Sequence, residues 1–285
     1  MTALRAACSL IGVLLLTHGC ARALPPPDPE SALATADPAA SDPAAAERLM
    51  VEAAAAYRQR PDEQAVEESI TLWLRAAVAD ATDAAPIIGA VRAQTWLAEY
   101  AAEPSRRNTV AQEAVQTAQW CRRREVSNPD CSYYLALAVG VQANQVRSTA
   151  TEGLDIIVRA LNNAIESGER EDQAGPHRVL ALVYLRAPGW PLGPGNPDTG
   201  LIHAEAAVDL FPGFAPNWLA LAEAYDKTEQ VEASGSAYHC ALELAVASVN
   251  PDAATWRQEA ETALSENPGT CSDPRYDSGS KPSGQ

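Results

Sequence analysis

Histidine, the side chain that most often transfers protons or binds metals, is scarce in this chain of 285 residues. The three that follow the N-terminal segment are His177, His203 and His239, and none lies in an HExxH motif. The sequence also has no GxSxG motif, no glycine-rich phosphate loop and no cysteine–histidine pair in a catalytic context. We therefore expect no catalytic site and no cofactor. His177 and His203 could meet, because they fall on the two helices of one predicted hairpin. Two histidines without a placed carboxylate make a poor metal site, so no metal is expected.

Cys20 ends an N-terminal segment, MTALRAACSLIGVLLLTHGC, that has one positive charge followed by a short apolar run. This is the layout of a secretory signal, and the run is too short to span a bilayer. The small residue before Cys20 resembles a lipobox, although His18 stands where a small residue is more usual. We predict that residues 1–19 are a signal peptide and that acyl chains on Cys20 hold the protein to a membrane. Ordinary signal-peptidase cleavage near Gly19 or Ala23 is the alternative.

Export would place the cysteines beyond Cys20 in an oxidising compartment, where disulfides form. They are Cys121, Cys131, Cys240 and Cys271, and four thiols allow three pairings. Cys121 and Cys131 flank one interhelical turn, and Cys271 lies in a tail that can fold back on the helix of Cys240. The disulfides Cys121–Cys131 and Cys240–Cys271 are therefore favoured, with buried or free thiols as the alternative. Without a CxxC pair, a four-cysteine zinc site is not expected.

Composition divides the rest of the chain. Residues 20–44 are rich in proline and alanine and poor in large apolar side chains, so we expect a tether there. Residues 267–285 are polar and rich in glycine, serine and proline, so we expect a mostly disordered tail beyond Cys271. Residues 45–266 form one predicted domain. The formal net charge of −16 disfavours nucleic-acid binding, because an acidic surface repels phosphates.

Apolar residues in the predicted domain recur three and four positions apart, and no alternating run of useful length interrupts them. This pattern predicts an all-α fold. Breaks such as Asn128-Pro129-Asp130 and Asn250-Pro251-Asp252 combine a turn with a helix-start signal. They delimit helices of about a dozen residues, which are expected to pair as antiparallel hairpins.

The unit APNWLALAEAYDKTEQVEASGSAYHCALELA carries the clearest repeat signal. Its small residues would let two helices approach closely, while its aromatic residues would fill the gaps between neighbouring helices. In type and spacing the unit resembles the tetratricopeptide repeat (TPR) on Trp218, Leu221, Ala222, Tyr225, Ser234, Tyr238 and Ala241. The resemblance implies a superhelical stack of about four to five antiparallel helical hairpins.

A loop at residues 187–197 interrupts the preceding hairpin with four prolines and three glycines. This composition predicts a tight, extended path that no helix could follow. As a binding element, the loop would present Trp190 and Leu192 to a partner at a rim of the superhelix. As a structural element, it would lay Trp190 over the hairpin. Arg178 and Arg186 precede the loop and could pair with an acidic ligand or with neighbouring carboxylates.

The segment before and around this loop resembles the T component of TRAP transporters, the TatT family, on Gly175, His177, Arg178, Leu180, Ala187, Pro188 and Gly189. Ala181 stands where the family has a glycine. The resemblance implies a periplasm-facing lipoprotein of the bacterial cell envelope that assists the solute-binding protein of a TRAP-type uptake system. The leading hypothesis is thus a non-enzymatic scaffold for protein–protein interaction. The alternatives are a small-ligand carrier with an internal apolar pocket, or an envelope or outer-membrane assembly factor.

Overall fold

The structure, a computed structural model, describes residues 39, 41–145, 150–168, 170–264 and 270–273. Regular structure within these ranges consists of eleven α-helices, and the only β feature in them is an isolated bridge within a loop. The all-α class predicted from the sequence is confirmed. The predicted signal peptide, the predicted lipidation site Cys20, and most of the predicted tether and tail lie outside the described residues.

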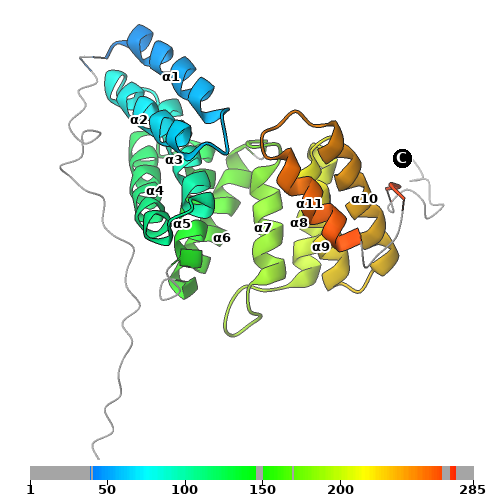
Figure 1. Cartoon of the computed structure of the whole chain (residues 1–285). Coiled ribbons are helices and arrows are strands. Elements are labelled where there is room, and N and C mark those ends of the chain that lie inside the picture. Colours follow the sequence, from blue (N-terminus) through cyan, green and yellow to red (C-terminus); the bar gives the residue numbers. More distant parts are fainter. Residues whose placement is uncertain (1–38, 40, 146–149, 169, 265–269, 274–285) are drawn as a thin grey trace, which may run out of the picture.

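The helices follow one another with short connections and pack mainly against their neighbours in the chain. They form five hairpins, α1–α2 to α9–α10, and α11 packs against α10 at the end of the array (Figure 1). The expected stack of helical hairpins is confirmed. Of the helices described here, none is long and apolar enough to span a membrane. The bounds are α1 Pro43–Tyr57, α2 Glu63–Ala79, α3 Ala85–Tyr100, α4 Pro104–Arg124, α5 Pro129–Gln145, α6 Ala150–Gly168, α7 Gly175–Arg186, α8 Pro197–Leu210, α9 Ala215–Lys227, α10 Val231–Ala247 and α11 Ala253–Leu264.

Helix starts are set by proline in the first turn and by side chains that cap the free backbone N–H groups. Proline occupies the first or second position of α1, α3, α4, α7, α8 and α9, where its missing N–H costs nothing. The Oδ1 atoms of Asp42 and Asn196 accept hydrogen bonds from the backbone three residues on, at 3.0 and 3.1 Å. These local signals explain why the breaks read from the sequence coincide with helix ends.

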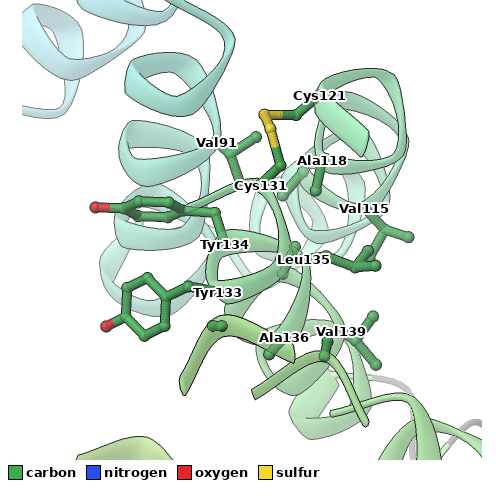
Figure 2. Packing of buried hydrophobic residues seen from close by; sticks show 14 of the residues in the cluster. Val91, Val115, Ala118, Cys121, Cys131, Tyr133, Tyr134, Leu135, Ala136 and Val139 are labelled. Carbon is green, nitrogen blue, oxygen red and sulfur yellow. A yellow bond between two sulfur atoms is a disulfide. The ribbon is translucent and has the colours of Figure 1, made fainter. Parts of the chain in front are cut away.

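Buried side chains form a core that runs along the whole array. Its central part lies between α3 and α7 and includes the fully buried Tyr133 and Leu161. Figure 2 shows the disulfide between Cys121 of α4 and Cys131 of α5 beside this part of the core. A second disulfide, Cys240–Cys271, joins α10 to the described piece of the tail. These are the two pairings favoured from the sequence.

The array curves until its first and last turns meet. Arg60, in the turn between α1 and α2, forms an ion pair with Asp252, in the turn between α10 and α11. Figure 1 shows these two turns side by side. Because the array curves, side chains from hairpins that are distant in the sequence come close to one another.

Candidate protein-interaction site

The loop between α7 and α8 is held in place by its own backbone. The N–H of Gly195 donates to the carbonyl of Pro188 at 2.8 Å, and the N–H of Asn196 donates to the carbonyl of Tyr184, also at 2.8 Å. A Cβ atom added to Gly195 would lie 2.8 Å from the Pro188 carbonyl oxygen, so only glycine fits there. The two stems of the loop are therefore fixed to each other and to the end of α7.

The tip of this loop exposes two large apolar side chains. Trp190 is 90% exposed and Leu192 is 74% exposed. In Figure 1 the loop projects beyond the ends of α7 and α8. This exposure contradicts the alternative in which Trp190 lies over the hairpin as a plug. Trp190 is thus an exposed aromatic side chain on a loop whose stem is fixed.

Arg178 lies near the N-terminal end of α7, away from the loop, and its contacts stabilise the fold. It is 8% exposed, and its guanidinium donates to Asn217 Oδ1 at 2.9 Å and to the carboxylate of Asp172. The same guanidinium donates to the backbone carbonyls of Asp172 and Gln173. Asp172, Gln173 and Ala174 all have left-handed φ angles, of 47, 54 and 67°. Arg178 therefore holds together a turn that L-residues rarely adopt.

Gly175 follows this turn for a steric reason. A Cβ atom at Gly175 would overlap the ring of Tyr133, whose hydroxyl donates to Asp172 Oδ2 at 2.6 Å. Burial raises the pKa of the Tyr133 hydroxyl well above its ordinary value, and the charge of Asp172 adds to the increase. The tyrosine thus remains a neutral donor. Gly175 and Arg178, two of the residues on which the TatT resemblance rests, are accounted for by packing in this chain.

His177 and His203, which the sequence places on the two helices of one hairpin, are in contact. Their Nδ1 atoms lie 3.0 Å apart, and the ring of Tyr184 stacks on that of His203 at 5.7 Å between centroids. Burial and the nearby His177 lower the pKa of His203 to about 4, which keeps it neutral at physiological pH. The described ranges contain no group of three or more histidine, cysteine or carboxylate side chains placed to hold a metal. The pair therefore joins α7 to α8 as a polar contact inside the hairpin.

Arg186, the residue directly before the loop, is paired with Glu223 of α9. Its Nε and Nη2 atoms donate to the two carboxylate oxygens at 2.9 and 2.6 Å. This hydrogen bonding raises the pKa of the Arg186 guanidinium. The sequence left open whether Arg186 pairs with an acidic ligand or with a neighbouring carboxylate, and the structure shows the pairing with a neighbouring carboxylate. It does not bring Arg186 and Arg178 together, because they lie at opposite ends of one helix.

One cluster of ionisable side chains, called the inner cluster, could not be predicted from the sequence. We define it as Glu99, Tyr100, Arg186, Glu223 and Glu259, which come from α3, α7, α9 and α11. Burial raises the pKa of Glu99, and the positive charge of Arg186 opposes that increase. Burial also raises the pKa of Glu259 and that of Tyr100, the latter to about 12. Carboxylates are so frequent in this chain that no spacing marks these ones, and only the curvature of the array brings them together.

Comparisons with known proteins support the fold. No family model matches the sequence, and no curated protein matches it. Among solved structures, the chain resembles TTC0263, a thermophilic TPR protein of Thermus thermophilus, with a TM-score of 0.59 and 20% identity over 77% of this chain and 99% of that one. The MamA protein also matches, with a TM-score of 0.42 and 12% identity over 84% of this chain and 98% of that one.

The chain therefore has a TPR-like fold, a curved stack of helical hairpins. Proteins of this fold generally bind protein partners through surfaces that the stacked repeats present. The exposed tip formed by Trp190 and Leu192 is the feature of this chain that departs most clearly from a plain repeat.

Proposed function

We propose that this protein is a non-enzymatic, membrane-tethered scaffold of the bacterial cell envelope that docks a partner protein on its 187–197 loop. The observation that carries the proposal is the 90% exposure of Trp190 on a loop whose stem is fixed by backbone hydrogen bonds. Tryptophan is among the residues enriched at binding hot spots. Because the loop is already ordered, binding would cost little additional conformational entropy.

Sequence features support the proposed location. A lipidated Cys20 would hold the chain to the membrane, and residues 21–42 would separate the anchor from the first helix. The two disulfides fit an oxidising compartment such as the periplasm. The resemblance to the TatT family supports a solute-binding protein of a TRAP-type uptake system as the partner. The helical repeat then serves as a rigid support that presents Trp190 at a distance from the membrane.

Affinity capture from membranes tests this function. The full chain, tagged at its C-terminus, is compared with Trp190→Ala and with Ile202→Ala, which truncates an apolar side chain on α8 that is 64% exposed. We expect the full chain and Ile202→Ala to recover a periplasmic solute-binding protein, and Trp190→Ala to bind it at least about 30-fold more weakly. The melting temperature of Trp190→Ala should not change, because its side chain contacts solvent.

Two outcomes would overturn parts of the proposal. Recovery of outer-membrane assembly factors in place of a solute-binding protein would assign the scaffold to envelope assembly. Equal binding by Trp190→Ala and the unaltered chain would remove the loop from recognition. Mass spectrometry of the mature N-terminus tests the anchor separately, since an acylated Cys20 has a mass that an ordinary cleavage product lacks.

A further inference from the structure

A groove of about 1010 Å³ lies between α2 and α4 and is partly open to solvent. Its apolar walls include Ile70, Leu74 and Val78 of α2 and Trp120 of α4. The three residues of α2 are spaced four apart, so they lie on one face of that helix. Pockets of this size hold drug-sized ligands, so the groove has room for two large side chains.

A buried acceptor without a partner also lines the groove. Gln94 of α3 is 2% exposed, and its Oε1 atom has no hydrogen-bond partner among the described residues. Such an atom has lost its bonds to water without replacement, and folded proteins contain few of them. In contrast, Thr117, which also lines the groove, donates its hydroxyl to the carbonyl of Glu113 at 2.9 Å. The groove therefore suits an occupant that brings an N–H or O–H group together with apolar surface.

The loop tip formed by Trp190 and Leu192 has both of these properties. The structure describes all six tryptophans of the chain, and Trp190 alone is exposed. Its indole combines an apolar ring with an N–H donor, and Leu192 adds further exposed apolar surface. The stem of the loop is held by backbone hydrogen bonds, so the tip needs little further ordering to bind.

The tip does not reach the groove of its own chain. Its stem is fixed to the end of α7, and α5 and α6 follow α4 in the stack before α7. In Figure 1 the loop projects beyond α7 and α8, well away from α2 and α4. A contact between tip and groove therefore needs a second copy of the chain.

Opposite charges lie beside the two surfaces. Arg75 lines the groove, is exposed and forms no ion pair with any described residue. Asp198, in the first turn of α8, is also exposed and forms no ion pair within the described ranges. A β-bridge joins Gly189 to Gly195, so the start of α8 lies close to the base of the tip. The two charges therefore favour one orientation of tip in groove, although the net charge of the chain opposes self-association.

We propose that copies of this chain associate head to tail, with Trp190 and Leu192 of one copy seated in the α2–α4 groove of the next. The indole N–H of Trp190 donates to Gln94 Oε1, and Asp198 faces Arg75. The tip and the groove are different surfaces, so the contact can extend to further copies as a ring or a chain. Where the proposed function holds, self-association competes with partner binding, because a tip inside a groove is not free for a partner.

The size of the contact indicates a weak association. A buried tryptophan contributes about 150–250 Å². A contact built on Trp190 and Leu192 therefore stays below the roughly 1,200 Å² at which stable interfaces begin. Copies held on one membrane meet more often than copies in dilute solution, which offsets part of this weakness. The test should therefore trap the contact covalently.

Photocrosslinking in the full chain tests the contact. p-Benzoylphenylalanine replaces Leu192, and irradiation of membranes is followed by digestion and mass spectrometry. We expect a crosslinked dimer in which the probe is joined to a peptide that contains Leu74 or Trp120. The same probe at Ile202, which is 64% exposed on α8, should give none of these crosslinks. Crosslinks only to other proteins, or only to parts of the chain outside the groove, would overturn the proposal.

A filled groove supplies an independent test. Thr71 lines the groove and is exposed, so Thr71→Trp adds bulk there with little effect on folding. Thr71→Trp and Trp190→Ala should each lower the yield of the crosslinked dimer at least about tenfold. Thr262→Trp is the matched control, since Thr262 of α11 is also exposed and, like Thr71, donates its hydroxyl to the carbonyl four residues before it. An unchanged yield with Thr71→Trp, in a variant whose melting temperature shows that it is folded, would contradict the proposal.

Mixing two defective copies tests the head-to-tail direction. One copy carries the probe at position 192 and Thr71→Trp, so that only its tip is functional. The other, with a different tag, carries Trp190→Ala, so that only its groove is functional. Together they should give the crosslinked dimer that neither gives alone, and adding Thr71→Trp to the second copy should abolish it. A mixture that gives no dimer would show that the tip does not enter the groove.

The same variants separate this inference from the proposed function. Thr71→Trp should still capture the solute-binding protein, because the groove takes no part in that binding. Intact capture without the crosslink would remove self-association alone. An intact crosslink, with capture by Trp190→Ala equal to that of the unaltered chain, would remove the proposed function alone.

Discussion

Arg60 and Asp252 are separated by 192 positions, yet their side chains form a two-point ion pair. Arg60 Nε donates to Oδ1 at 3.2 Å and Nη2 donates to Oδ2 at 2.9 Å. Nη1 donates to the carbonyl of Tyr57 at 2.9 Å, and the guanidinium lies 3.9 Å from the centre of the Tyr57 ring. The Arg60 side chain is only 8% exposed, so water competes little for these bonds. The pair fastens the first turn of the repeat array to the last.

Replacing Arg60 with alanine is expected to lower the free energy of unfolding by about 2–3 kcal/mol. Asp252 would keep its charge in a partly buried position without a partner, and the closed array would loosen. A double-mutant cycle with Asp252→Ala should give a coupling energy of about 1–2 kcal/mol. Small-angle scattering should show a larger radius of gyration for Arg60→Ala. The matched control is Arg257→Ala, which breaks the exposed pair with Glu261 and should change stability by less than about 0.5 kcal/mol.

The repeating helices were predictable from the sequence because their signals are local. Proline with a preceding Asp or Asn marks the start of a helix, as at Asp42-Pro43 and Asn196-Pro197, and these residues act within one turn. Trp218 and Tyr225 predicted core positions by their spacing, and both are buried. Each of these predictions depends on only a few neighbouring residues, which is why the structure agrees with it.

The inner cluster and the Arg60–Asp252 contact were not predictable, because they depend on summed rotations between successive hairpins. A small change in each rotation would move Glu99 away from Arg186 without changing any local pattern. The exposure of Trp190 was undecided for a related reason. The prolines and glycines of the loop predict a tight path, but they do not say whether that path turns over the helices or away from them.

The contact between His177 and His203 predicts a pH dependence of stability. The pKa of His203 is about 4 in the folded protein and near 6.5 in the unfolded chain. The unfolded chain therefore binds a proton more readily, so this contribution is fully present above pH 6.5 and is lost as pH falls toward 4. We expect the loss to be about 2 kcal/mol. His203→Phe keeps the ring against Tyr184 and should flatten this part of the profile in chemical denaturation. An unchanged slope between pH 6.5 and 4 would contradict the prediction.

Two helical glycines should respond in opposite directions to replacement by alanine. A Cβ atom on Gly89 would lie 2.5 Å from the indole ring of the buried Trp73, which has no room to move. Gly89→Ala should therefore destabilise the protein by about 1–3 kcal/mol. A Cβ atom on Gly140 would meet its nearest neighbour, Ile157, at 3.9 Å. Gly140→Ala should stabilise by about 0.5–1 kcal/mol through helix propensity alone. Thermal denaturation of the two variants side by side checks the opposite signs.

The two disulfides should differ in their access to reductant. Cys121 and Cys131 are completely buried, whereas Cys271 is exposed. Mild reduction followed by alkylation should therefore label Cys240 and Cys271 first. Replacing both of these cysteines with alanine opens a loop of 31 positions that includes α11, and we expect a loss of about 3 kcal/mol. Amide hydrogen exchange should increase mainly in α11. Simultaneous labelling of all four cysteines would contradict this order.

Arg178 should matter for stability and leave recognition at the loop intact. Arg178→Ala removes the donor for Asn217 and Asp172 in a buried setting, so we expect a loss of about 2–4 kcal/mol. Partner binding, measured well below the melting temperature, should be unchanged, because Trp190 lies at the other end of α7. If Arg178→Ala weakens binding without lowering stability, Arg178 takes part in recognition after all.

The left-handed turn next to Arg178 offers a compensating change. Gln173 is exposed and has a φ angle of 54°, a conformation in which a side chain costs energy and glycine does not. Gln173→Gly in the Arg178→Ala background should therefore restore about 1 kcal/mol, since it relieves the backbone strain that Arg178 otherwise holds in place. The same substitution at Gln59, an exposed residue in the turn after α1 whose φ angle is not left-handed, should give no such gain. If Gln173→Gly and Gln59→Gly change the free energy of unfolding equally, Arg178 stabilises the turn through its side-chain partners alone. The left-handed backbone conformation would then contribute nothing to the strain.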